Sequence, residues 1–119
     1  MLKRATGDVF EQRACDELTR AGLRVLARNY QTRHGEIDLV MREGDTVVFV
    51  EVRYRRSAGH GDAAASVTAS KQARVILAAQ HWLATHPRHA TRPCRFDVVS
   101  YDGPADAARF AWLRNAFEA

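Results

Sequence analysis

Two apolar stretches separated by a short polar turn constrain the fold more than any other feature of this chain. Residues 36–41 and 46–52 are rich in Val, Ile, Leu and Phe, a composition typical of β-strands. Residues 42–45 lie between them, with glycine at position 44, and such a short turn joins antiparallel neighbours. The second stretch is apolar on both faces, as in strands that are covered on both sides. The sequence therefore predicts a central antiparallel hairpin.

Helices and further strands are expected around this hairpin. Apolar residues at helical spacing predict one helix over residues 7–21 and a longer one over residues 66–86. Weak alternation predicts a strand over residues 23–30, and a run rich in Val predicts another over residues 94–101. These helices are expected to flank a sheet that contains the hairpin.

The remaining segments are two expected loops and a C-terminal stretch. Residues 55–65 and 86–93 are polar or contain Gly and Pro, so we expect loops there. Residues 108–117 are apolar enough to pack on the core, but their structure type is not determined by the pattern. The order αβββαβ plus a C-terminal segment predicts an α/β protein with a mixed sheet flanked by helices. Its length fits a single domain over residues 1–119.

Composition favours an anionic partner and an intracellular location. The formal net charge is +4 and the isoelectric point is about 9.6, which mildly favours nucleic acid. No apolar run resembles a signal peptide or reaches the length of a membrane span, so we expect a cytoplasmic protein that does not contact membranes. The two cysteines, Cys15 and Cys94, have no metal-ligand spacing and are expected to be free, buried thiols.

The hairpin brings two carboxylates to one face. A two-residue turn centred on Glu43 and Gly44 places Asp38 opposite Phe49, diagonal to Glu51. Because side chains alternate along a strand, Asp38 and Glu51 then share a face. Glu51 follows five uncharged residues, and burying a lone carboxylate costs on the order of several kcal/mol unless something compensates it.

Two interpretations of this pair carry equal weight from spacing alone. In the first, Asp38 and Glu51 bind a divalent cation such as Mg²⁺, which takes oxygen ligands, can activate a water and can hold a phosphate. In the second, they belong to a salt-bridge cluster in which Glu51 pairs with Arg33, Arg53 or Arg55.

Six motifs carry a resemblance to a known family. They are, in chain order, Gly7-Asp8-Val9-Phe10-Glu11, Gly35-Glu36-Ile37-Asp38, Phe49-Val50-Glu51-Val52-Arg53-Tyr54-Arg55, Ser70-Lys71-Gln72, Arg95-Phe96-Asp97-Val98-Val99 and Asn115-Ala116-Phe117. In their joint order and spacing the chain resembles the YraN family of small bacterial proteins over nearly its whole length. That family is similar to the archaeal-type Holliday-junction resolvases of the PD-(D/E)XK nuclease superfamily. The resemblance implies a restriction-endonuclease-like core.

The resemblance also implies roles for individual residues. Asp38 and Glu51 would be the acidic motif residues that hold Mg²⁺ or Mn²⁺, and Glu11 would be the additional acidic residue of such resolvases. The motif lysine falls at Arg53, which stays protonated and can only position or neutralise charge, so activity is in doubt. Lys71 could take the place of the motif lysine if its side chain points toward the sheet. The favoured interpretation is that the Lys71 side chain extends to the edge, where its ammonium group is solvated.

Basic residues near the expected site could contact a nucleic-acid backbone. The proposed phosphate-binding rim consists of Arg33, His34, Arg55, Arg56 and Arg74. The buried Asp97 is interpreted as a structural partner for Arg95 or another arginine. Related resolvases act as two-fold dimers, so the resemblance makes a homodimer one expectation.

Three functions follow from these patterns. The first is a metal-dependent endonuclease, or nucleic-acid-processing protein, that acts on branched or structured DNA. The second is a catalytically weak or inactive module of the same fold that binds DNA, including single strands, or RNA. The third is a protein-interaction domain without a nucleic-acid function. Metal binding separates the first two from the third, and cleavage separates the first from the second.

Overall fold

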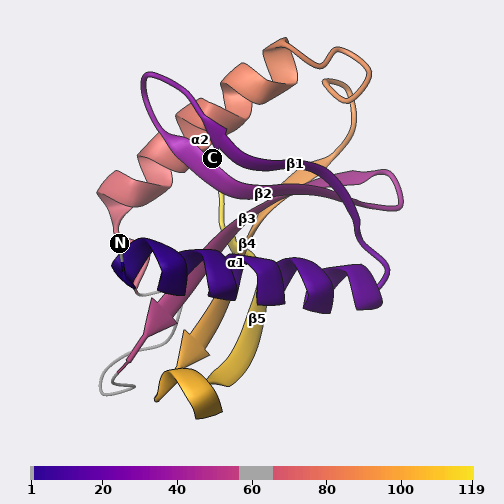
Figure 1. Ribbon diagram of the computed structural model, residues 1–119. Coiled ribbons are helices and arrows are strands. Elements are labelled where there is room, and N and C mark those ends of the chain that lie inside the picture. The colour runs from indigo at the N-terminus through magenta and orange to yellow at the C-terminus, as the bar shows by residue number, and fades with distance from the viewer. Residues whose placement is uncertain (1, 57–65) are drawn as a thin grey trace.

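A sheet with a helix on each face forms the framework of the chain (Figure 1). The structure is a computed structural model that describes residues 2–56 and 66–119, with side chains described from residue 7 onward. Its elements in chain order are α1 (Leu2–Arg20), β1 (Arg24–Gln31), β2 (Glu36–Glu43), β3 (Thr46–Arg55), α2 (Ala69–Ala84), β4 (Cys94–Asp102), the short 3-10 helix η1 (Ala105–Ala107) and β5 (Arg109–Phe117).

The sheet is mixed, with the predicted hairpin at its centre. Its strand order is β1-β2-β3-β4-β5, in which only β3 and β4 are parallel neighbours. Parallel neighbours need a long crossover, and α2 provides it between β3 and β4. The predicted element order is confirmed, and the C-terminal segment of undetermined type is the strand β5.

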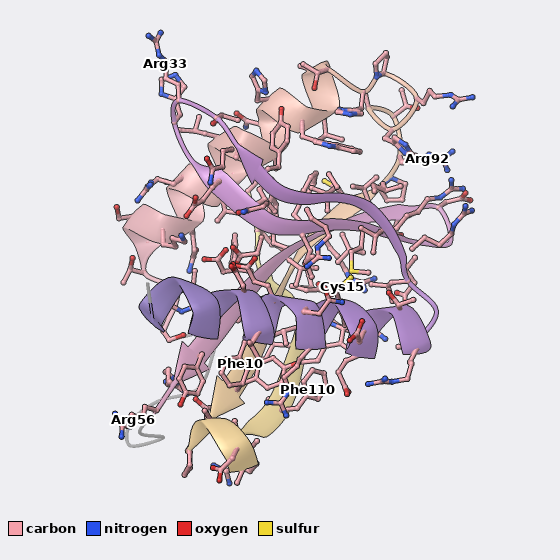
Figure 2. The ribbon with its side chains drawn as sticks, in the orientation of Figure 1. Phe10, Cys15, Arg33, Arg56, Arg92 and Phe110 are labelled. Atoms are coloured by element: carbon pink, nitrogen blue, oxygen red, sulfur yellow. The ribbon has the colours of Figure 1, made fainter. Side chains whose placement is uncertain are left out.

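Two apolar cores fill the space between the sheet and its helices. Phe10, Ala14 and Leu18 of α1 are buried against one face of the sheet, as their four-residue spacing predicts. Figure 2 shows Phe10 pointing from α1 toward the strands. Trp82 of α2 belongs to the core on the opposite face. Residues 47–50 are fully buried and alternate between the two cores, which confirms that β3 is covered on both sides.

The hairpin register differs from the predicted one. Glu43 pairs with Thr46 and Val40 pairs with Phe49, so Gly44 and Asp45 form the turn. Gly44 has a φ of 59°, which glycine adopts at little cost. The predicted turn, centred one residue earlier, is therefore wrong, and the strand partners shift by two residues. A shift of two residues leaves each side chain on the same face of the sheet. Asp38 and Glu51 are the positions that follow the last pair, Leu39 and Val50, so they lie opposite each other and not diagonally.

Several local expectations need correction or fall outside the described chain. Helix α2 begins at Ala69, and the side chain of Thr68 caps it by accepting a hydrogen bond from the backbone of Lys71, 3.2 Å away. Cys15 is buried as expected, but Cys94 is exposed. Most of the loop predicted over residues 55–65 lies outside the described residues. Within the described ranges, no helix has the length and apolar character needed to cross a bilayer.

A buried ionic network fastens β5 to the sheet. Asp97 on β4 is fully buried and accepts hydrogen bonds from Arg95 Nε, Trp112 Nε1 and the backbone N–H of Asn115, each at 2.9 Å. Asn115 has a φ of 52° and lies where the register between β4 and β5 shifts. Arg95 also donates to Glu43 at 2.8 Å. The structural interpretation of Asp97, as a partner of Arg95, is confirmed.

We predict that Asp97→Asn lowers the free energy of unfolding by roughly 3 kcal/mol, because it leaves the Arg95 guanidinium without its buried counter-charge. Urea unfolding followed by circular dichroism measures the loss. The matched control is Asp106→Asn on the exposed η1, which should change the free energy by less than about 0.5 kcal/mol. Equal effects of the two substitutions would contradict the role given to Asp97.

Candidate functional site

Three charged side chains from three different elements meet at one end of the hairpin. Asp38 lies on β2, Glu51 on β3 and Lys71 in the first turn of α2. Lys71 Nζ lies 3.2 Å from Glu51 Oε2 and 3.8 Å from Glu36 Oε1. Lys71 therefore points toward the sheet, and the favoured expectation that it snorkels to the edge is wrong. The physical reason is the buried carboxylate of Glu51, which attracts the ammonium group.

The carboxylate of Asp38 forms a hydrogen bond with β3 at the point where the backbone pairing of β3 with β2 ends. The last paired residues of β2 and β3 are Leu39 and Val50. Just beyond them, Asp38 Oδ2 accepts a hydrogen bond of 2.8 Å from the backbone N–H of Val52. This bond satisfies a strand donor that lacks a backbone partner on that side and holds Asp38 next to Glu51.

Burial dominates the electrostatics of this pair. Glu51 is only 2% exposed, and burial, reinforced by the negative charge of Asp38, raises the pKa of Glu51 to about 8 despite the nearby Lys71. Burial also raises the pKa of Asp38, although the hydrogen bond from Val52 opposes the shift. Among the described residues, Glu51 Oε1 has no hydrogen-bond partner. The pair therefore has one ammonium group, Lys71, for two carboxyl groups, and one of its oxygens lacks a polar contact.

Glu11 acts on this pair from α1. Burial and then the charge of Asp38 raise the pKa of Glu11 to about 7. Within residues 2–56 and 66–119, however, no three His, Cys, Asp or Glu side chains gather closely enough to enclose a metal ion. The structure thus brings Asp38, Glu51 and Lys71 together and leaves Glu11 as an electrostatic neighbour.

The Asp38–Glu51 pair fits the way in which Mg²⁺ is usually held in proteins. Mg²⁺ commonly binds one or two carboxylates and completes its coordination with waters and substrate phosphates. Glu51 Oε1 is a buried oxygen without a hydrogen-bond partner in the described part of the chain, so it is free to act as such a ligand. The pKa values of both carboxyl groups are raised, so each charged form is disfavoured. A nearby cation would stabilise the charged forms and lower these pKa values.

A close contact between the β1–β2 loop and α2 positions this end of the hairpin. Gly35 is buried, and a Cβ atom at this position would lie 2.1 Å from the backbone oxygen of Arg74. Thr32 Oγ1 donates to the carbonyl oxygen of Gly35 at 3.0 Å and accepts from its N–H at 3.1 Å. Our sequence reasoning missed this contact, and its only signal was the glycine directly before Glu36-Ile37-Asp38.

The predicted phosphate-binding rim is not gathered at one place. Arg55 is half-buried and forms an ion pair with Asp102, 2.7 Å apart. Figure 2 shows Arg33 and Arg56 pointing outward at opposite ends of the molecule. Two further members, His34 and Arg74, are exposed.

Arg53 lies two residues beyond Glu51 on β3, and its Nε is buried without a hydrogen-bond partner in the described part of the chain. None of the three arginines considered as partners for Glu51 pairs with it among the described residues. Lys71 takes that place.

We predict that the metal-free protein loses stability as the pH rises from about 5 to 8. Folded Glu51 keeps its proton up to a pKa of about 8, whereas the unfolded group releases it near 4.5, so the folded state binds more protons across this window. The total loss is on the order of a few kcal/mol. Chemical unfolding in chelator at several pH values measures it.

The variant Glu51→Gln should weaken this pH dependence, because the amide does not titrate, and Glu11, whose pKa is also raised, should account for part of what is left. Glu17→Gln is the control, since Glu17 is a partly exposed residue of α1 paired with Arg20. Identical profiles for the wild type and Glu51→Gln would show that the pKa of Glu51 is not raised.

Comparison with known proteins gives the family of the chain. Residues 10–101 match the model described as "Uncharacterised protein family UPF0102". The UPF0102 protein of Stutzerimonas stutzeri is 52% identical over 114 residues, which cover 96% of this chain and 95% of that protein. The UPF0102 protein of Nitrosococcus oceani is 49% identical over 114 residues, which cover 96% and 92%. The chain therefore belongs to the UPF0102 family, which confirms the predicted YraN-like membership.

Proposed function

We propose that this protein is a metal-dependent endonuclease with a restriction-endonuclease-like core that acts on branched or structured DNA. One observation carries the proposal. Glu51 is buried beside Asp38 at the end of the hairpin, and its Oε1 has no hydrogen-bond partner within the described residues. A purely structural carboxylate in such a place would be expected to have all its oxygens hydrogen-bonded, because an unsatisfied buried acceptor costs about 1–3 kcal/mol.

Asp38 and Glu51 would hold Mg²⁺ or Mn²⁺ in this proposal. The ion would supply positive charge to the phosphate of the substrate and lower the pKa of water. Asp38 Oδ2 accepts a hydrogen bond of 2.8 Å from the N–H of Val52, which fixes the orientation of this proposed ligand. The five-stranded mixed sheet with one helix on each face supports the assignment to the restriction-endonuclease-like class.

Lys71 supplies the cation that the motif places at residue 53. Its ammonium group comes from α2 instead of β3 and lies 3.2 Å from Glu51. In the nuclease it would contact a substrate phosphate oxygen, and a lysine can change its protonation state more readily than an arginine. Arg53 would neutralise charge beside it, so its presence does not remove the chemistry expected of the lysine.

In this proposal Glu11 would exchange protons with the site. A carboxyl with a pKa of about 7 can accept or release a proton at neutral pH, which is the range where general bases are effective. In phosphodiester hydrolysis, water adds to phosphorus, the bond to the leaving oxygen breaks, and that oxygen gains a proton. Glu11 would accept the proton that the attacking water loses, and solvent water would supply the proton that the leaving oxygen gains.

A second candidate is a nucleic-acid-binding module of the same fold that does not cleave. Arg53 favours this alternative, since it cannot release its proton at the motif position of the lysine. In the module, the Lys71–Glu51 ion pair would be a permanent structural contact. The two candidates differ in cleavage and in metal binding by Glu51, so the following experiments distinguish them.

We predict that Mn²⁺ binds the wild type and that Glu51→Gln weakens binding at least roughly tenfold, because one charged ligand is lost. Isothermal titration calorimetry measures the affinity, and circular dichroism verifies that the variant is folded. Glu17→Gln removes a surface carboxylate and should bind Mn²⁺ as the wild type does. Unchanged affinity in Glu51→Gln would remove Glu51 from the metal site.

We predict that the wild type cleaves labelled four-way junctions or flaps with Mg²⁺ or Mn²⁺, and that Lys71→Met lowers the rate roughly a hundredfold, the range typical of a lost charge-stabilising group. Single-stranded and duplex DNA serve as comparison substrates. Arg114→Met is the control, since Arg114 pairs with Glu43 away from the site. If Mn²⁺ binds but neither the wild type nor Arg53→Lys cleaves any substrate, the non-cleaving module replaces the endonuclease.

A further inference from the structure

A second, strongly basic site lies at the other end of the β1–β2 pair. A cavity of about 310 Å³ is lined by Arg24, Leu26, Arg42, Arg88, His89 and Arg92. The strand residues come from the start of β1 and the end of β2, and the other three from the segment after α2. In Figure 2, Arg92 of that segment lies on the right of the molecule, away from Arg33 and Arg56 on the left. Helix α2 has 16 residues and is roughly 24 Å long, which separates this cavity from Lys71 at its start.

The cavity holds far more positive than negative charge. Four of its six lining residues are arginines, and none of those six is acidic. Among the described residues, the carboxylate of Asp45 forms ion pairs with two of these arginines. Asp45 is 3.0 Å from Arg92 Nη1 and 3.7 Å from Arg42 Nη2, and it is 83% exposed. A single solvated carboxylate cannot balance four guanidinium groups, so the cavity attracts anions.

Two residues that line the cavity each have a polar atom without a hydrogen-bond partner in the described part of the chain. Arg92 Nε and His89 Nδ1 are buried and have no hydrogen-bond partner within residues 2–56 and 66–119. Buried donors in folded proteins are almost always hydrogen-bonded, so the hydrogen bonding of the Arg92 guanidinium group is incomplete within the described residues. The nearby arginines, after burial itself, also lower the pKa of His89, which is a consequence of the same positive potential.

We propose that this cavity, formed by Arg24, Arg42, Arg88, His89 and Arg92, binds a phosphate monoester. Guanidinium groups match phosphate oxygens in pairs and bind them with charge-assisted hydrogen bonds. The volume is at the lower end of the range of small-molecule sites, so it suits one phosphate group with part of its carrier. That group is carried either by a free nucleotide or by the end of a nucleic-acid strand. The inference does not depend on the metal site.

The test uses the full chain and four pairs of probes in solution. The first two pairs are inorganic phosphate with chloride, and adenosine 5′-monophosphate with adenosine. The other two are a short single-stranded DNA and a short single-stranded RNA, each with and without its 5′-phosphate. Nuclear magnetic resonance titration of the ¹⁵N-labelled protein measures each affinity and locates the site through amide shifts. We expect the phosphorylated member of at least one organic pair to bind more tightly, with shifts in residues 24–26 and 88–92. Preference for the nucleotide identifies a small-molecule site, and preference only for the oligonucleotide identifies a strand end.

Matched variants assign the binding to the cavity. Arg92→Gln and Arg24→Gln should each weaken binding of the preferred probe roughly tenfold or more, since each removes charge-assisted hydrogen bonds. Arg24 is exposed, so its replacement leaves the fold intact even if Arg92→Gln unfolds the chain. Arg33→Gln removes the same charge from the β1–β2 loop, away from the cavity, and this variant should bind the probe as tightly as the wild type does. Equal affinity for every probe and its dephosphorylated partner overturns the proposal, and so does an equal loss in Arg33→Gln.

Discussion

The cost of burying the carboxylate of Glu51 determines how this end of the molecule is built. β3 is apolar on both faces because a helix covers each side, and Glu51 continues that buried strand. A charge in such a place needs a compensating partner within a few ångströms. Lys71 provides one, 3.2 Å away, but only for one of the two oxygens of Glu51. The remaining electrostatic demand is what makes this pair of carboxylates suitable for a cation.

Several ordinary structural features serve this one arrangement. The Thr68 cap fixes the first turn of α2 and therefore the starting point of the Lys71 side chain. Gly35 lets the β1–β2 loop approach α2 at Arg74, which sets the position of the following residues of β2. Asp38 accepts a hydrogen bond from the backbone N–H of Val52 on β3, just beyond the last backbone pair of β2 and β3. The site is thus assembled from strand ends and a helix start, each held by its own local contacts.

Much of the fold could be predicted because it rests on local patterns, whereas the details of the site depend on distant contacts. The prediction that Asp38 and Glu51 share a face of the sheet is correct although the predicted turn residues are wrong. The actual register differs by two residues, and such a shift leaves each side chain on the same face. The sequence left two directions open for the Lys71 side chain, and the buried Glu51 on another element decides between them. The basic cavity combines strand ends with the segment after α2, so nothing local predicted it.

The most direct test of the metal site is to map where Mn²⁺ binds. Mn²⁺ is paramagnetic, so it broadens the amide signals of nearby residues in the ¹⁵N spectrum of the labelled protein. We expect substoichiometric Mn²⁺ to broaden residues 37–39, 50–53 and 71 first, and Glu51→Gln to abolish this selectivity. Broadening that begins elsewhere, or that spreads evenly over the exposed carboxylates, would contradict a cation site at Asp38 and Glu51.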